Sequence, residues 1–273
     1  MVHIRSVIYA LQDKGIVSTK VSIGQISGGT SSKVYLLEDK GNKMILKIND
    51  PEVIEQEVLF LNEYQSISNF PKVVYFDERF QFFMMEYVVG KMIDRHESKE
   101  IVLNQSYIFK DYHLAKDNRV GYVDTLYTNF HEFLKVNVLI DIDTIVNYAQ
   151  IDEVFYMDKL DTMPLPNEHP KYVHGDFGYH NMLVNENKIS VIDPTPMQNL
   201  ILYELLFMYF STPYDINVIS LKSIYQLYIE YEEMTFDTFL FYAEVVCLLR
   251  IATCARHHIE EMPLYIEVFE NIF

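Results

Sequence analysis

Residues 172–194, YVHGDFGYHNMLVNENKISVIDP, place three polar side chains in an otherwise apolar segment. Asn181 follows Asp176 by five residues, and Asp193 ends an apolar run. The residues between Asn181 and Asp193 form two short apolar runs around the polar turn NENK, which predicts a hairpin that returns Asp193 beside Asn181. Carboxylate and amide oxygens that lie close together are typical ligands of a hard divalent cation. The segment therefore predicts a cation site.

Length and composition indicate a globular protein. A chain of 273 residues with 49% hydrophobic and 22% charged residues can bury a large core and divide into two lobes. No run approaches the roughly 18 apolar residues of a membrane span, and the N-terminus lacks the pattern of a signal peptide. We therefore expect a cytoplasmic protein that does not contact membranes. Cys247 and Cys254 lie on a helical pattern, which favours buried positions in a reducing compartment.

The charge of the chain is strongly negative and unevenly distributed. The net charge of −17 argues against nucleic acid as a partner, because phosphate backbones are bound by Lys and Arg clusters. Residues 1–95 carry 11 basic and 12 acidic residues, whereas residues 96–273 carry 11 and 27. Almost all of the excess negative charge therefore lies in the later part of the chain. No sequence pattern indicates an oligomeric state.

The early part of the chain has the pattern of a strand meander with one helix. β-Branched and aromatic runs flank the glycine-rich stretch GGTS and the polar turn EDKGNK. Asp50 and Pro51 are typical of a helix start, and apolar residues follow them at helical spacing. The predicted strands are residues 20–27, 32–38, 43–49, 72–78 and 81–90, and the predicted helix is residues 50–66.

The later part of the chain is predicted to be mainly helical, apart from residues 172–194. Residues 224–234 and 239–262 carry long apolar stripes at helical spacing. The predicted fold class is α+β, with a small β-rich N-terminal lobe at residues 1–88. A larger, mainly helical C-terminal lobe follows at residues 89–273.

The motifs of residues 172–194 resemble those of the aminoglycoside phosphotransferase and choline kinase-like family. That family has the pattern His-Gly-Asp-x-x-x-x-Asn followed by Ile-Asp-Pro or Ile-Asp-Trp, and this chain has HGDFGYHN and VIDP in the same order. The resemblance extends over about residues 24–210. It implies a bilobal protein kinase-like fold and a kinase that transfers the γ-phosphate of ATP, or of GTP, to a hydroxyl group of a small molecule.

The resemblance also implies roles for individual residues of the segment. Asp176 would orient the acceptor hydroxyl and accept its proton, and His174 would brace the loop. Asn181 and Asp193 would hold Mg²⁺ against the phosphates of the nucleotide. One departure is Leu200, which stands about where the family has an aspartate.

Lys47 would contact the α- and β-phosphates and needs an acidic partner on the following helix. Glu55 and Glu57 are both candidates. Glu57 has apolar neighbours at three and four residues in both directions and therefore lies on the inward stripe, so we choose Glu57 and keep Glu55 in reserve.

Two further segments are expected to contact the nucleotide. The first is a glycine loop whose small residues let the backbone approach phosphates. The second resembles the hinge of the same family, and this resemblance implies that its backbone would bind adenine. The loop comprises Gly28, Gly29, Thr30, Ser31 and Ser32, and the hinge comprises Met85, Glu86, Tyr87 and Val88.

Three other functions fit part of the pattern. A nucleotide-binding pseudokinase would explain the altered region at Leu200. A protein kinase is disfavoured by Gly175, which stands where an Arg would answer a phosphorylated activation loop. A metal-dependent hydrolase would use His174, Asp176, His180 and Asp193 as ligands, but it leaves Lys47 and Glu57 without a role.

The acidic later part of the chain predicts a cationic acceptor. A concentration of negative charge gathers cations, so we expect a hydroxylated amine such as an aminoglycoside, an amino sugar or an amino alcohol. The acids considered for this attraction are Glu230, Glu232, Glu233, Asp237, Glu260, Glu261 and Glu270.

Overall fold

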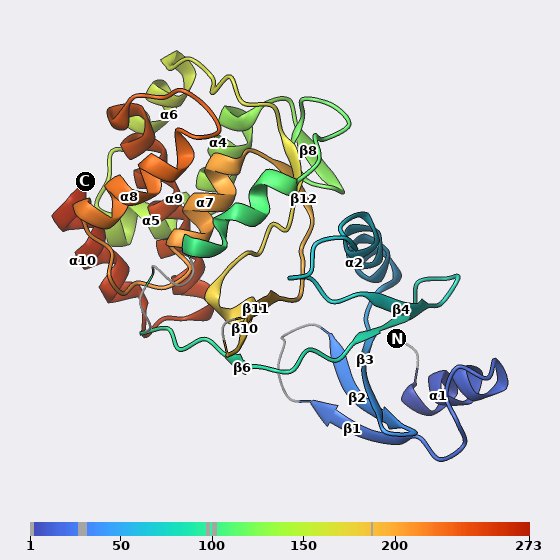
Figure 1. Cartoon of the computed structure of the whole chain (residues 1–273). Coiled ribbons are helices and arrows are strands. Elements are labelled where there is room, and N and C mark those ends of the chain that lie inside the picture. Colours follow the sequence, from blue (N-terminus) through green and yellow to red (C-terminus); the bar gives the residue numbers. More distant parts are fainter. Residues whose placement is uncertain (1–2, 27–31, 97–98, 100–102, 187) are drawn as a thin grey trace. The chain divides into compact units, whose positions relative to one another are not determined.

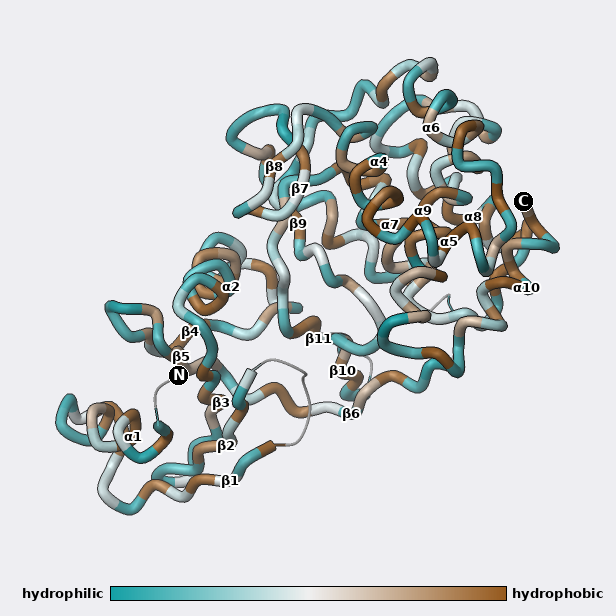
Figure 2. Tube along the Cα trace, turned by 180° about the vertical axis from the view of Figure 1, so that it is seen from behind, coloured by the Kyte–Doolittle hydropathy of each residue, from teal (hydrophilic) through white to brown (hydrophobic). Residues whose placement is uncertain are grey.

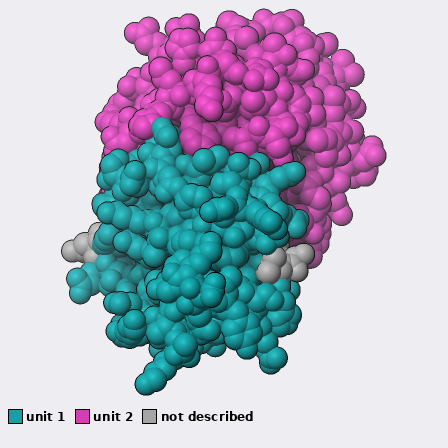
Figure 3. Space-filling view, turned by 90° about the vertical axis from the view of Figure 1, so that its right-hand side faces the viewer, with its two compact units in different colours: residues 1–91, 182–194 teal, residues 92–181, 195–273 magenta. Residues whose placement is uncertain are grey.

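The computed structural model describes residues 3–26, 32–96, 99, 103–186 and 188–273. The chain divides into two compact units, which Figure 3 shows in different colours. The first unit comprises residues 1–91 and 182–194, and the second comprises residues 92–181 and 195–273. The first unit is rich in strands and the second is mainly helical, which confirms the predicted α+β class.

A five-stranded antiparallel sheet forms the body of the first unit (Figure 1). Its strand order is β1-β2-β3-β5-β4, and all neighbouring strands are antiparallel. Lys40 and Gly41 both have positive φ in the turn between β2 and β3, as a tight two-residue hairpin requires. The elements are β1 Ser22–Ile26, β2 Lys33–Asp39, β3 Asn42–Ile48, β4 Val73–Phe76, β5 Phe82–Glu86, α1 Ile4–Asp13 and α2 Pro51–Glu63.

The two faces of this sheet carry different side chains. Leu46 and Met84 are cross-strand partners on one face, where they join a buried apolar cluster with helix α1, an element that the sequence patterns did not predict. Lys47 and Phe83 are partners on the other face, where Lys47 meets Glu57 of α2. The alternation of β3 therefore turns the lysine away from the α1 cluster and towards α2.

The predicted hairpin of residues 182–194 is present and belongs to the first unit by its contacts. Strands β10 (Met182–Asn185) and β11 (Lys188–Val191) are antiparallel. The amide of Val191 donates to the carbonyl oxygen of Asn69 at 2.8 Å, and Asn69 Nδ2 donates to the carbonyl oxygen of Ile189 at 2.8 Å. The predicted boundary at residue 88 counted this hairpin with the second lobe, whereas the structure groups it with the first unit.

The second unit surrounds a long apolar helix, α9, which contacts α4, α5, α7, α8 and α10. Figure 2 shows apolar residues concentrated on α9 and α7, and Cys247 and Cys254 are buried within α9. By length and composition α9 could cross a membrane, but 61% of its most apolar window is buried in the structure. The helices are η1 Asn104–Asp111, α4 Phe130–Ile140, α5 Ile142–Ala149, α6 Glu153–Thr162, η2 Tyr179–Asn181, α7 Ile201–Tyr209, α8 Val218–Tyr228, α9 Phe236–His257 and α10 Met262–Ile272.

A small sheet in the second unit was not predicted, and it positions two functional segments. Its order is β8-β7-β12-β9, and β9 pairs with β12 with Val173 opposite Met197. The loop at residues 174–178 follows β9 directly, and α7 begins shortly after β12. The pairing therefore brings this loop beside the start of α7. The strands of this sheet are β7 Val120–Tyr122, β8 Thr125–Tyr127, β9 Lys171–Val173 and β12 Met197–Asn199. A further short strand, β6 Lys91–Met92, lies where the chain leaves the first unit and borders β10.

Candidate active site

The first group of predicted site residues lies around Lys47 in the first unit. Lys47 Nζ donates to Glu57 Oε1 at 2.6 Å and also contacts Asp193 Oδ1. The side chains of Lys47 and Glu57 are buried, whereas Glu55 is exposed. Of the two acids that the sequence left open, the structure therefore places Glu57 against the lysine.

Burial and the attraction between opposite charges shift the pKa values of this group in opposite directions. Burial by itself lowers the pKa of Lys47, but attraction to Glu57 and Asp193 outweighs it, so the pKa of Lys47 lies above its ordinary value. Burial raises the pKa of Glu57 to about 7 against the attraction of Lys47. Lys47 is therefore a fixed positive charge that two carboxyl groups hold in place.

The backbone at Asp193 has an unusual conformation. Its φ is 64°, in the left-handed region that residues other than glycine adopt rarely and at a cost in energy. Asp193 lies two residues after the end of β11, and 44% of its side chain is exposed. The carboxylate that contacts Lys47 is therefore also open to a ligand from solvent.

The second group lies around Asp176 in the second unit. His180 Nε2 lies 2.9 Å from Asp176 Oδ1, and Asn181 Nδ2 donates to Asp176 Oδ2 at 2.8 Å. Asn181 Nδ2 also donates to the carbonyl oxygen of Asp176 at 2.9 Å. Burial raises the pKa of Asp176, but the bonds to His180 and Asn181 and the nearby imidazole of His174 outweigh it, so the pKa lies below its ordinary value. Asp176 is therefore held as a carboxylate with both oxygens engaged.

Glycine is required within this loop at position 175. Gly175 has a φ of 77°, and a Cβ there would overlap the carbonyl oxygen of Thr195. No other residue type fits that space without moving the backbone. This explains in physical terms why the chain has Gly where a protein kinase has Arg.

Glu204 braces the same loop from helix α7. Its carboxyl group accepts the amide hydrogen of Gly175 at 3.2 Å, and the amide of His174 also donates to it. Glu204 is fully buried, and burial raises its pKa to about 8. The charge of Asp176 also raises this pKa, whereas the hydrogen bonds from the two amides lower it. The contact between Glu204 and this loop was not predicted from the sequence and is a finding of the structure.

Helix α7 also shows how the chain compensates for Leu200. Leu200 is the residue before α7 and has no side chain that can cap the helix. The carboxylate of Glu168 instead accepts the amide hydrogens of Ile201 at 2.6 Å and Leu202 at 3.4 Å. The substitution therefore leaves the start of α7 satisfied, because a carboxylate from elsewhere in the chain supplies the cap.

His174 is a buried residue of the loop. Its ring lies edge-on to Phe177, and its Nδ1 accepts the amide hydrogen of Asp176 at 3.3 Å. Its carbonyl oxygen accepts the amide hydrogen of Thr195 at 2.9 Å. These contacts fix the backbone of the loop on both sides of Gly175.

The predicted nucleotide-binding loop lies mostly outside the described residues. Nothing can be placed for Gly28, Gly29, Thr30 and Ser31. Ser32 is described, and its hydroxyl accepts a hydrogen bond from Asn49 Nδ2 at 2.8 Å.

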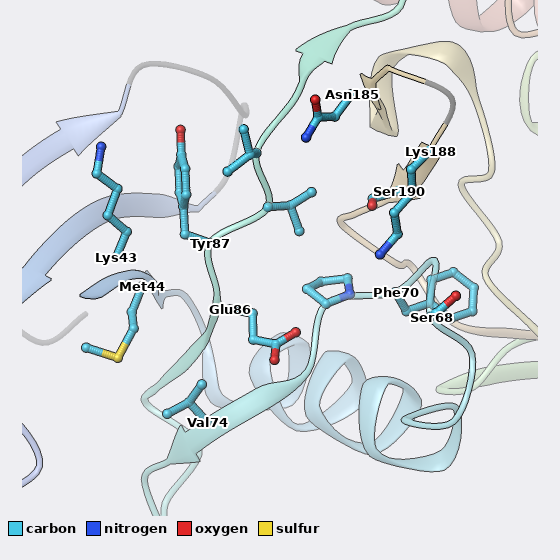
Figure 4. A pocket seen from close by; sticks show the side chains of 13 residues that line it. Lys43, Met44, Ser68, Phe70, Val74, Glu86, Tyr87, Asn185, Lys188 and Ser190 are labelled. Atoms are coloured by element: carbon cyan, nitrogen blue, oxygen red, sulfur yellow. The ribbon is translucent and has the colours of Figure 1, made fainter. Parts of the chain in front are cut away.

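A pocket of about 420 Å³ lies beside the predicted hinge in the first unit (Figure 4). Met44 of β3 and Glu86 of β5 are cross-strand partners that both line it. Figure 4 shows Glu86 and Lys188 on opposite sides of the pocket. Met85 is not among the residues that line it, so its predicted adenine contact remains a prediction. The hinge residues in the lining are Glu86, Tyr87 and Val88.

Two side chains near Asp176 had not been predicted as site residues. Burial raises the pKa of Tyr122, and the charge of Asp176 raises it further, as does that of Asp124. Burial also raises the pKa of Tyr203, with Asp176 among the nearby charges. Tyr122 is 40% exposed, so it offers an aromatic surface near the carboxylate. No sequence signal marks it, because it reaches Asp176 only through the pairing of β7, β12 and β9.

The acids predicted to attract a cationic acceptor differ in their contacts. Glu230 pairs with Lys110 at 3.0 Å, and Glu261 pairs with Arg95. These two negative charges are thus partly neutralised within the second unit. Among the described residues, no set of three or more His, Cys, Asp or Glu side chains is arranged to hold a metal ion, which gives the hydrolase hypothesis no support.

Comparison with known proteins identifies the family. A model of the phosphotransferase enzyme family matches residues 22–234. A search of curated proteins finds no match.

Several solved structures share the fold over nearly the whole chain. An aminoglycoside phosphotransferase, APH(4)-Ia, in a complex with ADP and hygromycin B, is 16% identical with a TM-score of 0.65 and covers 96% of each chain. A protein described as a candidate fructosamine-3-kinase from Thermobifida fusca is 15% identical, with a TM-score of 0.62 over 98% of this chain and 99% of the other. A choline kinase from Cryptosporidium parvum is 11% identical, with a TM-score of 0.62 over 98% of this chain and 94% of the other. At these identities the likeness shows the fold, and it confirms the bilobal protein kinase-like fold that the sequence predicted.

Removing the carboxyl group of Glu57 should destabilise the protein. We expect Glu57→Ala to lower the free energy of unfolding by about 3 kcal/mol or more, because the buried ammonium then loses the oxygen that accepts its hydrogen bond at 2.6 Å and one of its two partners. The matched control is Glu55→Ala on the exposed face of the same helix, which should change it by less than about 0.5 kcal/mol. Urea denaturation measures both. Equal effects of the two variants would show that the Lys47–Glu57 contact does not hold the first unit together.

The stability of the protein should depend on pH through Glu204. The folded protein keeps a proton on Glu204 up to a pKa of about 8, whereas the unfolded chain releases it near 4.5. Over that interval the folded state binds more protons, so the free energy of unfolding falls as the pH rises. Glu204→Gln cannot ionise and still offers an oxygen to the amides of the loop, so its unfolding curves should lose this part of the pH dependence. The same slope in both proteins would contradict the assignment.

Proposed function

Because the chain belongs to the phosphotransferase enzyme family, we propose that it transfers the γ-phosphate of ATP to a hydroxyl group of a small molecule. The observation that supports this most strongly is the carboxylate of Asp176. It is partly exposed, it is held by two side-chain donors, and the loop that carries it is braced by the buried Glu204. Such an ionised and oriented group suits the acceptance of a proton from an alcohol.

In this proposal the first unit supplies the charges that act on the nucleotide. Lys47 neutralises phosphate charge, and Glu57 fixes its position. Phosphoryl transfer depends mainly on positioning and on compensation of charge, and a buried lysine held by two carboxyl groups is suited to both.

Asn181 and Asp193 have the chemistry that Mg²⁺ needs. The amide nitrogen of Asn181 is used by Asp176, which leaves its amide oxygen as the atom for a cation. Asp193 presents a carboxylate that is 44% exposed. When bound, Mg²⁺ would neutralise negative charge on the phosphate oxygens.

The acceptor we propose is an amine-bearing alcohol. The second unit contains 26 acidic and 11 basic residues, so its field favours cations. Tyr122 adds a partly exposed aromatic ring near Asp176, a surface suited to a sugar ring or a cationic group.

We expect Asp176→Asn to lower turnover by about 100-fold or more with little change in nucleotide binding, because the amide cannot accept the proton. Transfer of label from [γ-³²P]ATP to a panel of small alcohols measures turnover, and calorimetry measures binding. A variant with near wild-type turnover would contradict the role of Asp176.

The acceptor class is tested with matched pairs in the same assay. Each amine-bearing sugar or alcohol is compared with its neutral analogue at low and high salt. We expect the amine to be the better substrate, with a preference that weakens as salt rises. Equal transfer to the neutral analogues would reject the charge-based acceptor and leave the phosphotransferase assignment intact.

A further inference from the structure

We propose that His180 positions the carboxylate of Asp176 for phosphoryl transfer, a role that rests on Asp176 acting as proposed above. His180 lies in η2, directly after the loop, and the family pattern leaves its position unspecified between Asp176 and Asn181. The structure places its imidazole Nε2 at 2.9 Å from Asp176 Oδ1. Since the carboxylate can only accept, Nε2 must be the nitrogen that carries the hydrogen.

Two side chains donate to the carboxylate of Asp176, His180 and Asn181. The one described hydrogen bond of the His180 side chain is the bond to this carboxylate. Asn181 divides its amide nitrogen between Oδ2 and the carbonyl oxygen of Asp176, and its own oxygen is the candidate ligand of a cation. With the Asn181 bond alone, the carboxylate could turn about its Cβ–Cγ bond. A second donor on Oδ1 fixes the plane of the group, and so fixes the direction from which it meets an acceptor hydroxyl.

The ring of His180 is itself held by the loop. It lies against Gly178, where an added Cβ would come within 2.6 Å of Cε1, 2.9 Å of Nδ1 and 2.9 Å of the Cβ of Ser211. The backbone continues this support, since the amide of Gly178 donates to the carbonyl oxygen of Asp176 at 2.9 Å. A glycine at position 178 is therefore needed for the ring to reach the carboxylate, and this packing is a second observation that supports the proposal.

Two matched substitutions separate positioning from packing. His180→Gln keeps a side-chain N–H at the same number of bonds from Cβ as Nε2, whereas His180→Leu keeps bulk without a donor. We expect His180→Leu to lower kcat about 10- to 100-fold with less than about a 2-fold change in the KM for ATP, and His180→Gln to recover most of the loss. The assay is release of phosphate from MgATP with water as the acceptor, which requires no identified substrate. Equal losses in both variants, or no loss in either, would overturn the proposal.

The Asp176→Asn background distinguishes this proposal from the proposed function. If Asp176→Asn abolishes turnover and His180→Leu does not change it, the positioning role is wrong and the function stands. If Asp176→Asn itself retains turnover, the function assigned to Asp176 is wrong. If both proposals hold, His180→Leu should cause no further loss in the Asp176→Asn protein.

A measurement without turnover completes the test. A long-range ¹H–¹⁵N NMR spectrum of the imidazoles should show His180 with its hydrogen on Nε2 in the wild-type protein. This signal should change in Gly178→Ala, where the added methyl group displaces the ring. A hydrogen on Nδ1, or a signal unaffected by Gly178→Ala, would overturn the proposal.

Discussion

The burial of one ammonium group organises the first unit. A charged amine removed from water is costly unless carboxylates compensate it, and Lys47 is compensated by Glu57 and Asp193. These three side chains come from a central strand, the helix that follows it and the end of a hairpin much later in the chain. Strand, helix and hairpin must therefore be in place together, and this requirement also fixes the charges that would meet the nucleotide.

The second unit uses a buried acid in a comparable way. Glu204 receives the amides of Gly175 and His174, so the loop before Asp176 takes its shape from a carboxyl group that is excluded from water. The left-handed backbone at Gly175 is possible only because glycine stands there. In the first unit a buried ammonium holds the side chain of Asp193, and in the second a buried acid holds the backbone of the loop that carries Asp176.

Features that depend on local pattern could be predicted from the sequence, and features that depend on distant pairing could not. The apolar neighbours of Glu57 were sufficient to choose it over Glu55 as the partner of Lys47, because helix periodicity decides which way a side chain points. The bond between Glu204 and Gly175 spans 29 residues and exists because β9 pairs with β12, which no local signal encodes. Glu230 and Glu261 were predicted to attract a cationic acceptor, but each already pairs with a basic side chain. These partners, Lys110 and Arg95, lie more than 100 residues away in the chain, so no local pattern indicates them.

In the function proposed above, the charges around Lys47 and Asp193 form a Mg²⁺-dependent nucleotide site. It is tested most directly by calorimetric titration of ATP, with Mg²⁺ and with EDTA, into the wild-type protein and Asp193→Asn. The account predicts that Mg²⁺ strengthens ATP binding to the wild type and that Asp193→Asn loses this gain, because a hard anionic ligand has been removed. The account would be contradicted by binding that is the same with and without Mg²⁺, or by an equal gain in both proteins.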